Sequence, residues 1–379
     1  MSVSALLSIQ RLKYAFLSFP NALGGSSLDS FFARKRLFRK VAYLENQLLS
    51  IEDTTLHASQ MDDASHRRIV LDRSKFFPIS FSWPGPLEAF EDLHELTRKP
   101  FSIIFPGEPY GFTDYKSYLE EYRSSVYGTT FKKAGWDCFR HVEILAMGGI
   151  PYQPDVLECP DLAMSLYPKN LIATAHTFAN AGLIAPRDLR AAIYSRFVER
   201  LTSEAMASFI LSKTQFVPDR VIFLDDTMNT IPDYLSVMTY VGLKKLLGSE
   251  KVVAPLGAGP VFEDWTGNQD NLHGLGFGYC KVLSCSLRNS TEEAPADLQD
   301  AFEMVGPNDL LVAANINRSK ALAELVSSAE IPEAHKLHIW GDDRSPNRSQ
   351  LKWLKTLEGH VAIREVYSDV LTKSFLQVL

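Results

Sequence analysis

One segment of the chain concentrates residue types that bind phosphate and hydrogen-bond to sugars. It contains cationic, glycine, imidazole and carboxylate positions: Lys132, Lys133, Gly135, Arg140, His141 and Glu143. Free backbone N–H groups at the start of a helix carry partial positive charge and attract phosphate, and an arginine can grip a phosphate through two hydrogen bonds. Arg140 and Glu143 are three positions apart, so they share one face of the expected helix. Arg140 is then placed to hold a diphosphate, and Glu143 to accept hydrogen bonds from ribose hydroxyls.

The same segment also has a purely structural interpretation. Arg140 and Glu143 would then form an exposed ion pair worth about 0.5 kcal/mol. Gly148 and Gly149 would only end the helix. The spacing by itself leaves both interpretations open.

A second group of candidates follows a strongly apolar stretch, residues 221–224. Asp225, Asp226 and Asp233 come after this expected strand, and a carboxylate with a tuned pKa can act as a general base. Alternatively, one aspartate caps the next helix and the others are solvated. His273 stands in a glycine-rich segment that permits close approach to a ligand, although a loop histidine can equally be structural or solvated.

The sequence Phe-Leu-Asp-Asp-Thr at the end of this strand also suggests a phosphatase of the haloacid-dehalogenase type. That chemistry needs an aspartate nucleophile two positions before a second aspartate. Phe223 occupies the nucleophile position and Asp225 the second, so no phospho-aspartate can form. The sequence Gly341-Asp342-Asp343 is similar to a metal-binding motif of such enzymes and keeps this interpretation as a minor alternative.

The elements that must position these residues alternate between strands and helices, which indicates parallel sheets with crossover helices. We expect strands at 75–83, 101–105, 150–152, 221–224, 251–253, 309–314 and 337–340, and helices at 114–127, 137–147, 187–213, 234–247 and 319–328. The predicted fold is α/β, with two Rossmann-like domains at residues 75–214 and 215–379. A helical and basic N-terminal extension, residues 1–74, is expected to precede them.

Length and composition are typical of a folded protein with two domains: 379 residues, of which 46% are hydrophobic and 22% charged. The net charge of −6 argues against a dedicated binder of duplex nucleic acid, because such proteins carry a basic excess. No stretch reaches the roughly 20 apolar residues that a membrane-spanning helix needs. The basic segment 31–40 is either a solvated helix face or a weak docking site for an acidic membrane surface.

The four cysteines predict neither a metal site nor a disulfide. No two of them form a CxxC pair, and none has a histidine at zinc-site spacing; they are Cys138, Cys159, Cys280 and Cys285. Scattered cysteines in a chain of this size are typical of reduced, cytoplasmic proteins. We therefore expect a cytoplasmic protein, with the membrane surface as the alternative location through residues 31–40.

The first group of candidates carries a resemblance to a known family. Residues 132–152, KKAGWDCFRHVEILAMGGIPY, resemble the donor-site segment of exostosin-like GT-B glycosyltransferases, where a Gly-Trp-Asp-x-x-Arg-His-x-Glu helix is followed by a small-Gly-x-Ile-Pro turn. The similarity covers residues 75–213, and Val142 replaces the tyrosine that the family usually has. The resemblance implies nucleotide-sugar contacts at Arg140 and Glu143, with Lys132, Lys133 and His141 nearby.

The second half resembles the acceptor-side domain of the same family. The segments PDYL (232–235), LHGLGF (272–277) and IWGDD (339–343) fall in similar order, although Trp340 and Asp342 depart from the family's Asp-Gly-Glu-Asp. The donor-like half thus precedes the acceptor-like half, which reverses the family's order. The chain is then either circularly permuted, with one intact cleft, or incomplete, so that a second copy is needed.

The resemblance implies a metal-independent hexosyl- or pentosyltransferase that moves a sugar from a nucleotide-sugar to a glycan, a lipid-linked saccharide or another surface polymer. The helix start and Arg140 would stabilise the leaving diphosphate. Asp233, His273 or Asp225 would deprotonate the acceptor hydroxyl, and no cofactor is implied besides the donor substrate. The alternatives are the phosphatase and a non-catalytic glycan- or nucleotide-binding protein on the same fold. A homo-oligomer is expected if the two halves do not form one cleft.

Overall fold

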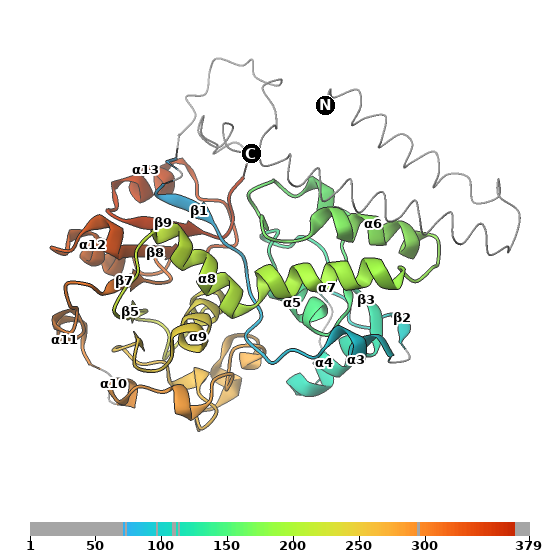
Figure 1. Cartoon of the computed structure of the whole chain (residues 1–379), viewed down its shortest axis with the longest axis horizontal. Coiled ribbons are helices and arrows are strands. Elements are labelled where there is room, and N and C mark those ends of the chain that lie inside the picture. The colour runs from blue at the N-terminus through green and yellow to red at the C-terminus, as the bar shows by residue number, and fades with distance from the viewer. Residues whose placement is uncertain are drawn as a thin grey trace, which may run out of the picture. The chain divides into compact units, whose positions relative to one another are not determined.

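The computed structural model describes residues 71–367 except 73, 96–97, 108–110, 113 and 294–295, all within one compact unit of the chain. It confirms an α/β protein, with a six-stranded and a three-stranded parallel sheet that are Rossmann-like (Figure 1). Nearly all of the predicted extension, residues 1–74, lies outside the described residues, and so does the basic segment 31–40. None of the helices in the described part is long and apolar enough to cross a membrane.

The six-stranded sheet is built from short strands that are almost entirely buried. They are β1 (Phe76–Pro78), β5 (Val221–Leu224), β6 (Val252–Val253), β7 (Leu310–Ala313), β8 (Lys336–Trp340) and β9 (His360–Ile363). Their order is β1-β9-β8-β7-β5-β6, and every neighbouring pair is parallel. Strands covered on both faces read as continuous apolar runs, which is how β5 and β7 read in the sequence.

The strand order of this sheet reverses at β5. Helix α9 (Tyr234–Leu247) leads from β5 to β6 on one side, whereas β7 pairs with β5 on the other side. Helices α12 (Lys320–Ser328) and α13 (Arg348–Thr356) then connect β7 to β8 and β8 to β9. In open parallel sheets such a reversal creates a crevice outside the carboxyl ends of the strands, where ligands usually bind.

The three-stranded sheet holds β2 (Lys99–Phe101), β3 (Ser125–Thr129) and β4 (Ile150–Tyr152) in that order. Helices α4 (Tyr115–Arg123) and α5 (Phe139–Ala146) connect these strands in turn, so the sheet is a parallel βαβαβ unit. Asp114 caps α4, since its carboxylate accepts the N–H of Ser117 at 2.8 Å. The helix predicted at 114–127 ends at Arg123, because Ser125 and the residues after it pair as β3.

The remaining elements are shorter or lie beside the sheets. They are α3 (Phe90–Glu95), α6 (Lys169–Asn180), α10 (Ser290–Glu293), α11 (Leu298–Glu303) and single 3₁₀ turns at 156–158, 259–261, 269–271, 273–276, 285–287 and 333–335. The strand predicted at 75–83 is limited to β1, and the strand predicted at 101–105 is β2, which begins and ends earlier.

The helix predicted at 187–213 is two helices, α7 (Arg187–Leu201) and α8 (Ser203–Thr214). Thr202 between them is extended, with φ −79° and ψ 153°, and its hydroxyl accepts the N–H of Ala205. The extended residue also forms a β-bridge with Trp83. The single-helix prediction is wrong here because the apolar periodicity continues across a threonine that serves as an N-cap.

Two connections tie the sheets together. Strand β1 precedes the three-stranded sheet in the chain, yet it is an edge strand of the six-stranded sheet and pairs with β9. Helices α7 and α8 return the chain from beside α5 to beside α9 (Figure 1). At the contact between α8 and α9, Gly242 lies against the backbone of Ser203, where no side chain fits. The boundary near residue 214 stays a prediction, and the segment assigned to the first domain contributes β1 to the larger sheet.

Candidate functional site

The carboxyl edges of the two sheets meet at a junction. It is formed by the loop between β3 and α5, residues 130–138, and by the segments that follow β8 and β9. Gly135 of this loop lies directly against the backbone carbonyl of Asp343, so that a Cβ at Gly135 would clash. Arg364, which follows β9, donates through Nη1 to the Asp137 carbonyl at 2.8 Å. The first group of candidates therefore begins at the edge of the six-stranded sheet where ligands of parallel sheets bind.

Arg364 and Glu365 organise this junction, and sequence reasoning missed both. The Arg364 guanidinium donates to the Gly341 carbonyl at 3.0 Å and pairs with the carboxylate of Asp343, and the Arg364 side chain is 1% exposed. Glu365 Oε1 accepts the backbone N–H of Asp137 at 2.7 Å. The available signal was a charged pair directly after a short apolar strand, a position that faces the ligand crevice of a parallel sheet.

Burial perturbs the two carboxyl groups of the junction. Desolvation raises the pKa of Asp137 to about 6 and the pKa of Glu365 to about 7. The nearby Arg364 and backbone N–H donors oppose this rise; Asp137 Oδ2, for example, accepts the N–H of Phe81 at 2.7 Å. Carboxyl groups with a pKa near neutrality are suited to proton transfer, and they occur at functional sites more often than elsewhere.

Arg140 and Glu143 are each 4% exposed, so the interpretation of an exposed ion pair is wrong. All eight residues of α5 are buried. Glu143 accepts hydrogen bonds from the hydroxyls of Tyr115 and Tyr118, each at 3.0 Å. Burial raises the pKa of Glu143 to about 7, although the tyrosine hydroxyls and Arg140 oppose the rise. The predicted pair thus lies inside the protein, with Glu143 bonded to two tyrosines from α4.

His141 is a fully buried core residue. Its Nε2 lies 3.1 Å from the hydroxyl of Thr130, and its ring centroid is 5.4 Å from that of Tyr167. Desolvation lowers the pKa of His141 to about 3, so the ring is neutral at pH 7. A neutral, enclosed imidazole does not add positive charge for a phosphate.

Lys132 and Lys133 are the exposed cations of the first group. Lys132 Nζ lies 4.9 Å from the ring of Trp136 and 5.7 Å from the ring of Tyr367. Cation–π contacts of this kind hold an ammonium group in place while leaving its hydrogens open to an anion. Lys132 and Lys133 therefore remain candidates for attracting a phosphate to the loop 130–138.

Asp225, directly after β5, is buried and internally bonded. Its carboxylate accepts the N–H and the hydroxyl of Thr227 at 2.9 Å and 2.7 Å, and the hydroxyl of Ser236. Desolvation raises its pKa. The prediction that the aspartates which do not cap a helix are solvated is therefore wrong for Asp225. Asp226 is exposed and accepts the Ser319 hydroxyl at 2.5 Å.

Asp233 caps α9, which confirms the capping alternative for this residue. Its carboxylate accepts the N–H of Leu235 at 3.0 Å and pairs with Arg318 at 3.4 Å, and its side chain is 14% exposed. Asp233 also lies next to the junction, because a Cβ built on Gly341 would be 3.2 Å from its Oδ1. The carbonyl of Gly341 accepts the hydrogen bond from the Arg364 guanidinium.

The glycine-rich segment 272–281 joins the second half to helices α4 and α5. Gly278 lies against the ring of Phe139, the first residue of α5, and the Phe277 ring is 5.1 Å from the ring of Tyr115. Left-handed backbone occurs at Gly274, Gly276 and Gly278 and also at the non-glycine positions Leu275 and Lys281. Such a density of unusual backbone is typical of loops whose shape serves function.

His273 is exposed at the start of this segment. Its ring is 6.2 Å from that of Tyr234, which lies 4.9 Å from Phe139. The structure thus brings His273 and Asp233 to the same junction as the start of α5. Ser236 links Asp225 to Asp233. Its hydroxyl donates a hydrogen bond to Asp225, and its backbone N–H donates to Asp233 at 3.5 Å.

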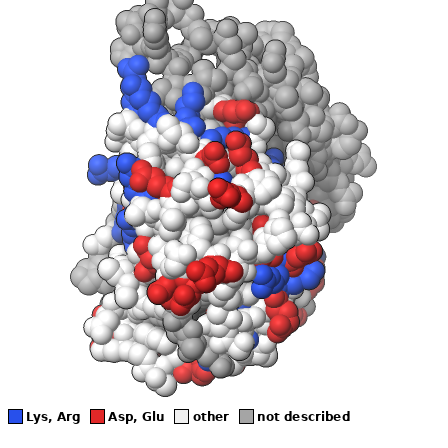
Figure 2. Space-filling model, turned by 90° about the vertical axis from the view of Figure 1, so that its left-hand side faces the viewer, with Lys and Arg blue, Asp and Glu red and all other residues white. Residues whose placement is uncertain are grey.

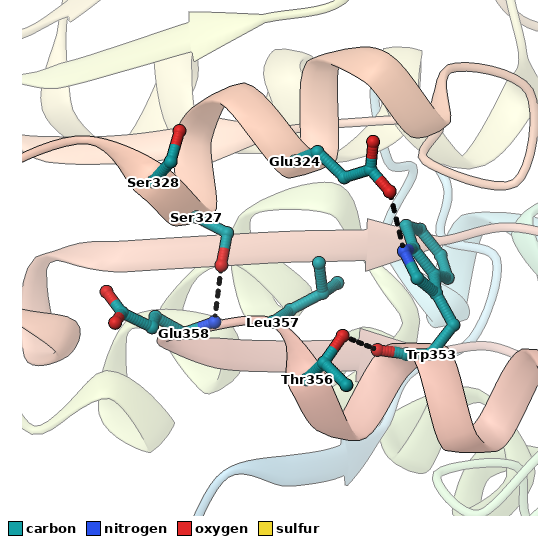
Figure 3. Close-up of a pocket in the computed structure, with 7 residues that line it drawn as sticks. All are labelled: Glu324, Ser327, Ser328, Trp353, Thr356, Leu357 and Glu358. Carbon is teal, nitrogen blue, oxygen red and sulfur yellow. Dashed lines mark hydrogen bonds between the residues drawn. The ribbon is translucent and has the colours of Figure 1, made fainter.

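A shallow pocket of about 250 Å³ lies between the ends of α12 and α13 (Figure 3). It is lined by Glu324, Ser327, Ser328, Trp353, Thr356, Leu357 and Glu358. Several of its polar groups are already bonded to one another, such as Trp353 Nε1 to Glu324 at 3.3 Å and the Glu358 N–H to Ser327 at 2.7 Å. Because Glu358 precedes β9, the pocket lies at the amino edge of the sheet. It is also below the roughly 300–1,000 Å³ of ordinary ligand pockets, so we do not include it in the candidate site.

The described residues contain no group of three or more His, Cys, Asp or Glu side chains arranged to hold a metal ion, and all four cysteines are free. On the face drawn in Figure 2, acidic and basic side chains are interspersed among the described residues. That face offers no continuous basic stripe of the kind that tracks a nucleic-acid backbone.

No family model, no curated protein and no solved structure matches the chain. The indications of function are the geometry of the junction and the resemblance of the motif around Arg140.

Proposed function

We propose that this protein is a glycosyltransferase with a GT-B-like arrangement of two Rossmann-like units, which transfers a sugar from a nucleotide-sugar to a saccharide acceptor. One observation carries the proposal. The loop ahead of α5, which resembles the donor segment of exostosin-like enzymes, contacts the carboxyl edge of the second sheet at Asp343, Arg364 and Glu365. Two parallel sheets whose carboxyl edges face each other form the setting in which a donor and an acceptor can be held together.

The donor half of the site is the loop 130–138 with the start of α5. Its backbone N–H groups, Lys132 and Arg140 attract the diphosphate and stabilise the charge that develops on it as the sugar leaves. Glu143 accepts two tyrosine hydroxyls now, and a ribose hydroxyl takes the place of one of them in the proposed complex.

The acceptor half is the edge formed by the segments after β5 and β8. Asp233 is the better candidate for the general base, since both carboxylate oxygens of Asp225 already accept hydrogen bonds, from Thr227 and Ser236. Asp233 retains one oxygen at a loose 3.4 Å contact with Arg318 and is partly exposed. His273 is the second candidate, because its exposed ring lies at the same junction through Tyr234.

A ligand screen tests the donor assignment. Thermal unfolding is measured with UDP-, GDP-, CMP- and TDP-sugars, and a ligand at about 100 times its Kd adds about 2.7 kcal/mol to the free energy of unfolding. Arg140→Ala is expected to abolish that gain. Arg200→Ala, which removes an exposed arginine from the last turn of α7, serves as the control. A folded wild-type protein that neither binds nor turns over any of these donors would contradict the proposal.

A non-catalytic binder on the same architecture is the second candidate function. The burial of Arg140, His141 and Glu143 favours it, because a fully enclosed motif can persist as a structural element after activity is lost. Donor binding without hydrolysis or transfer, with a range of saccharide acceptors, would support this candidate. The phosphatase alternative is disfavoured, since Phe223, at the position of the nucleophile, is buried 5.4 Å from the ring of Tyr240.

A further inference from the structure

Glu365 places a carboxylate at the loop that the proposed function assigns to the diphosphate. Its Oε1 accepts the N–H of Asp137 at 2.7 Å. A Cβ built on Gly135 would lie 2.7 Å from the same oxygen, so the loop and the carboxylate are in direct contact. Glu365 is fully buried and lies just after β9, a strand of the other sheet. Because carboxylates and phosphates are both bound by backbone N–H groups, the two anions compete for these donors.

The charge of the neighbouring Arg364 acts on Glu365 and partly offsets the rise in its pKa, but the Arg364 ion pair is with Asp343 and not with Glu365. The Arg364 guanidinium is committed to the carbonyls of Gly341 and Asp137 and to the carboxylate of Asp343. An incoming phosphate at the loop would therefore meet the negative charge of Glu365 at close range. Like charges that are a few ångströms apart and shielded from water repel each other strongly.

We propose that Glu365 is an internal anion that occupies the loop ahead of α5, and that a phosphate-bearing ligand binds there by displacing its carboxylate. The proposal rests on the proposed function in one respect, namely that this loop receives phosphate. It adds that the charge of Glu365 regulates access to the site.

The protonation state of Glu365 then controls affinity. Burial raises its pKa to about 7, so below that pH the neutral acid competes less well and no longer repels an anion. Binding of an anion is therefore expected to strengthen as the pH falls through about 7. The titratable or charged groups that act on Glu365 from all packed elements are Asp137, Cys159, Lys169, Arg364 and Tyr367, with Asp343 acting through Arg364.

Sulfate is the appropriate probe, because it stays doubly charged over the whole pH range of the test. Its affinity for the full chain is measured by titration calorimetry at about pH 5.5 and 8. For wild type we expect at least tenfold tighter binding at the lower pH. Glu365→Gln keeps an acceptor oxygen but removes the charge, and is expected to bind sulfate about tenfold tighter than wild type at pH 8 and within about twofold of it at pH 5.5.

Glu358→Gln is the matched control, because Glu358 flanks the same strand at its opposite end and pairs with Lys336 at 2.8 Å. It changes the net charge equally and should leave sulfate affinity unchanged at pH 8. Equal effects of the two substitutions, or weaker binding by Glu365→Gln, would overturn the proposal. The wild-type pH profile needs no variant, so a flat profile overturns it even if Glu365→Gln fails to fold.

The outcomes separate this inference from the proposed function. If a nucleotide-sugar binds wild type and Glu365→Gln equally well at pH 8, the inference fails and the proposed function stands. If neither sulfate nor any nucleotide-sugar binds either protein, both fail.

Discussion

Gly278 lies against the ring of Phe139, so that a Cβ at Gly278 would overlap the ring carbons, and its backbone is left-handed with φ +81°. Phe139 is the first residue of α5, and Gly278 belongs to the loop of the second half that carries His273. The contact therefore joins the two groups of candidate residues. It accounts for the glycine at position 278, in a segment whose glycines sequence reasoning attributed to the approach of a ligand.

Gly278→Ala is expected to destabilise the protein and to separate the two halves of the site. The left-handed backbone alone costs about 1–2 kcal/mol for alanine, and overpacking against Phe139 adds about 1–3 kcal/mol. Gly182→Ala is the control, since Gly182 has φ +69° and nothing within 4 Å of an added Cβ. Denaturant unfolding of the three proteins measures the difference, and equal losses would show that the ring contact contributes nothing.

Glu143 makes stability depend on pH. Burial raises its pKa to about 7, so its contribution to stability is fully present below about pH 4.5 and is lost as the pH rises through about 7. Glu143→Gln removes this titration. The free energy of unfolding of the variant, relative to that of wild type, is therefore expected to rise by up to about 3 kcal/mol from pH 5 to pH 8.

Unfolding free energies at both pH values test this, with Glu199→Gln as the control at an exposed position of α7. A difference between Glu143→Gln and wild type that stays constant with pH would contradict the prediction. It would mean that the carboxyl group of Glu143 ionises without cost in the folded state.

The parallel α/β architecture was predictable from the sequence because β5 and β7 are continuous apolar runs separated by helices with clear periodicity. The break at Thr202 was not, because the apolar positions stay in helical step across it and only the bridge to Trp83 reveals the cap. Strand β1 was expected in the right place but not in the right sheet, since nothing local to 76–78 specifies pairing with a strand near the other end of the chain.

The candidate site was partly predictable for a similar reason. Arg140 and Glu143 were found because their spacing along one helix is a local pattern. Arg364 and Glu365 were missed because their importance comes from the approach of Asp137, more than two hundred positions away in the chain. The burial of His141 was equally invisible, since its partners Thr130 and Tyr167 lie on different elements.

The ion pair between Lys244 and Glu292 is fully buried, with 2.9 Å between the charged atoms. Glu292 also accepts the Tyr240 hydroxyl at 2.8 Å and the Ala254 N–H at 2.9 Å, so it fixes α10 to α9 and to the residue after β6. Lys244→Met leaves the carboxylate without its cation and is expected to cost about 3–5 kcal/mol. Glu292→Gln should cost less in the Lys244→Met background than in wild type.

A double-mutant cycle on the unfolding free energy measures that coupling, which we expect to be about 1–3 kcal/mol. Lys245→Met provides the control, because Lys245 is the next residue of α9 and is half-buried, with a 3.6 Å contact to Glu204 and a hydrogen bond to the Pro84 carbonyl, so its removal takes away the same charge without leaving a buried carboxylate unpaired. Additive losses for Lys244 and Glu292 would show that the pair contributes no energy beyond its separate parts.

Asp233 combines two roles that one pair of substitutions separates. As the N-cap of α9 it accepts the N–H of Leu235 through Oδ1, while Oδ2 faces Arg318. Asn caps a helix about as well as Asp, whereas Ala does not. Asp233→Asn should therefore keep the wild-type stability, and Asp233→Ala should lose about 1 kcal/mol.

If Asp233 is the general base, both substitutions lower kcat by about 10² or more while leaving the affinity for the nucleotide-sugar unchanged. Steady-state kinetics and donor binding on the two variants check this. If Asp233→Asn is fully active and Asp233→Ala loses activity only because it is less stable, Asp233 is a helix cap and not the general base. The kinetic and binding measurements would then be repeated on His273→Gln.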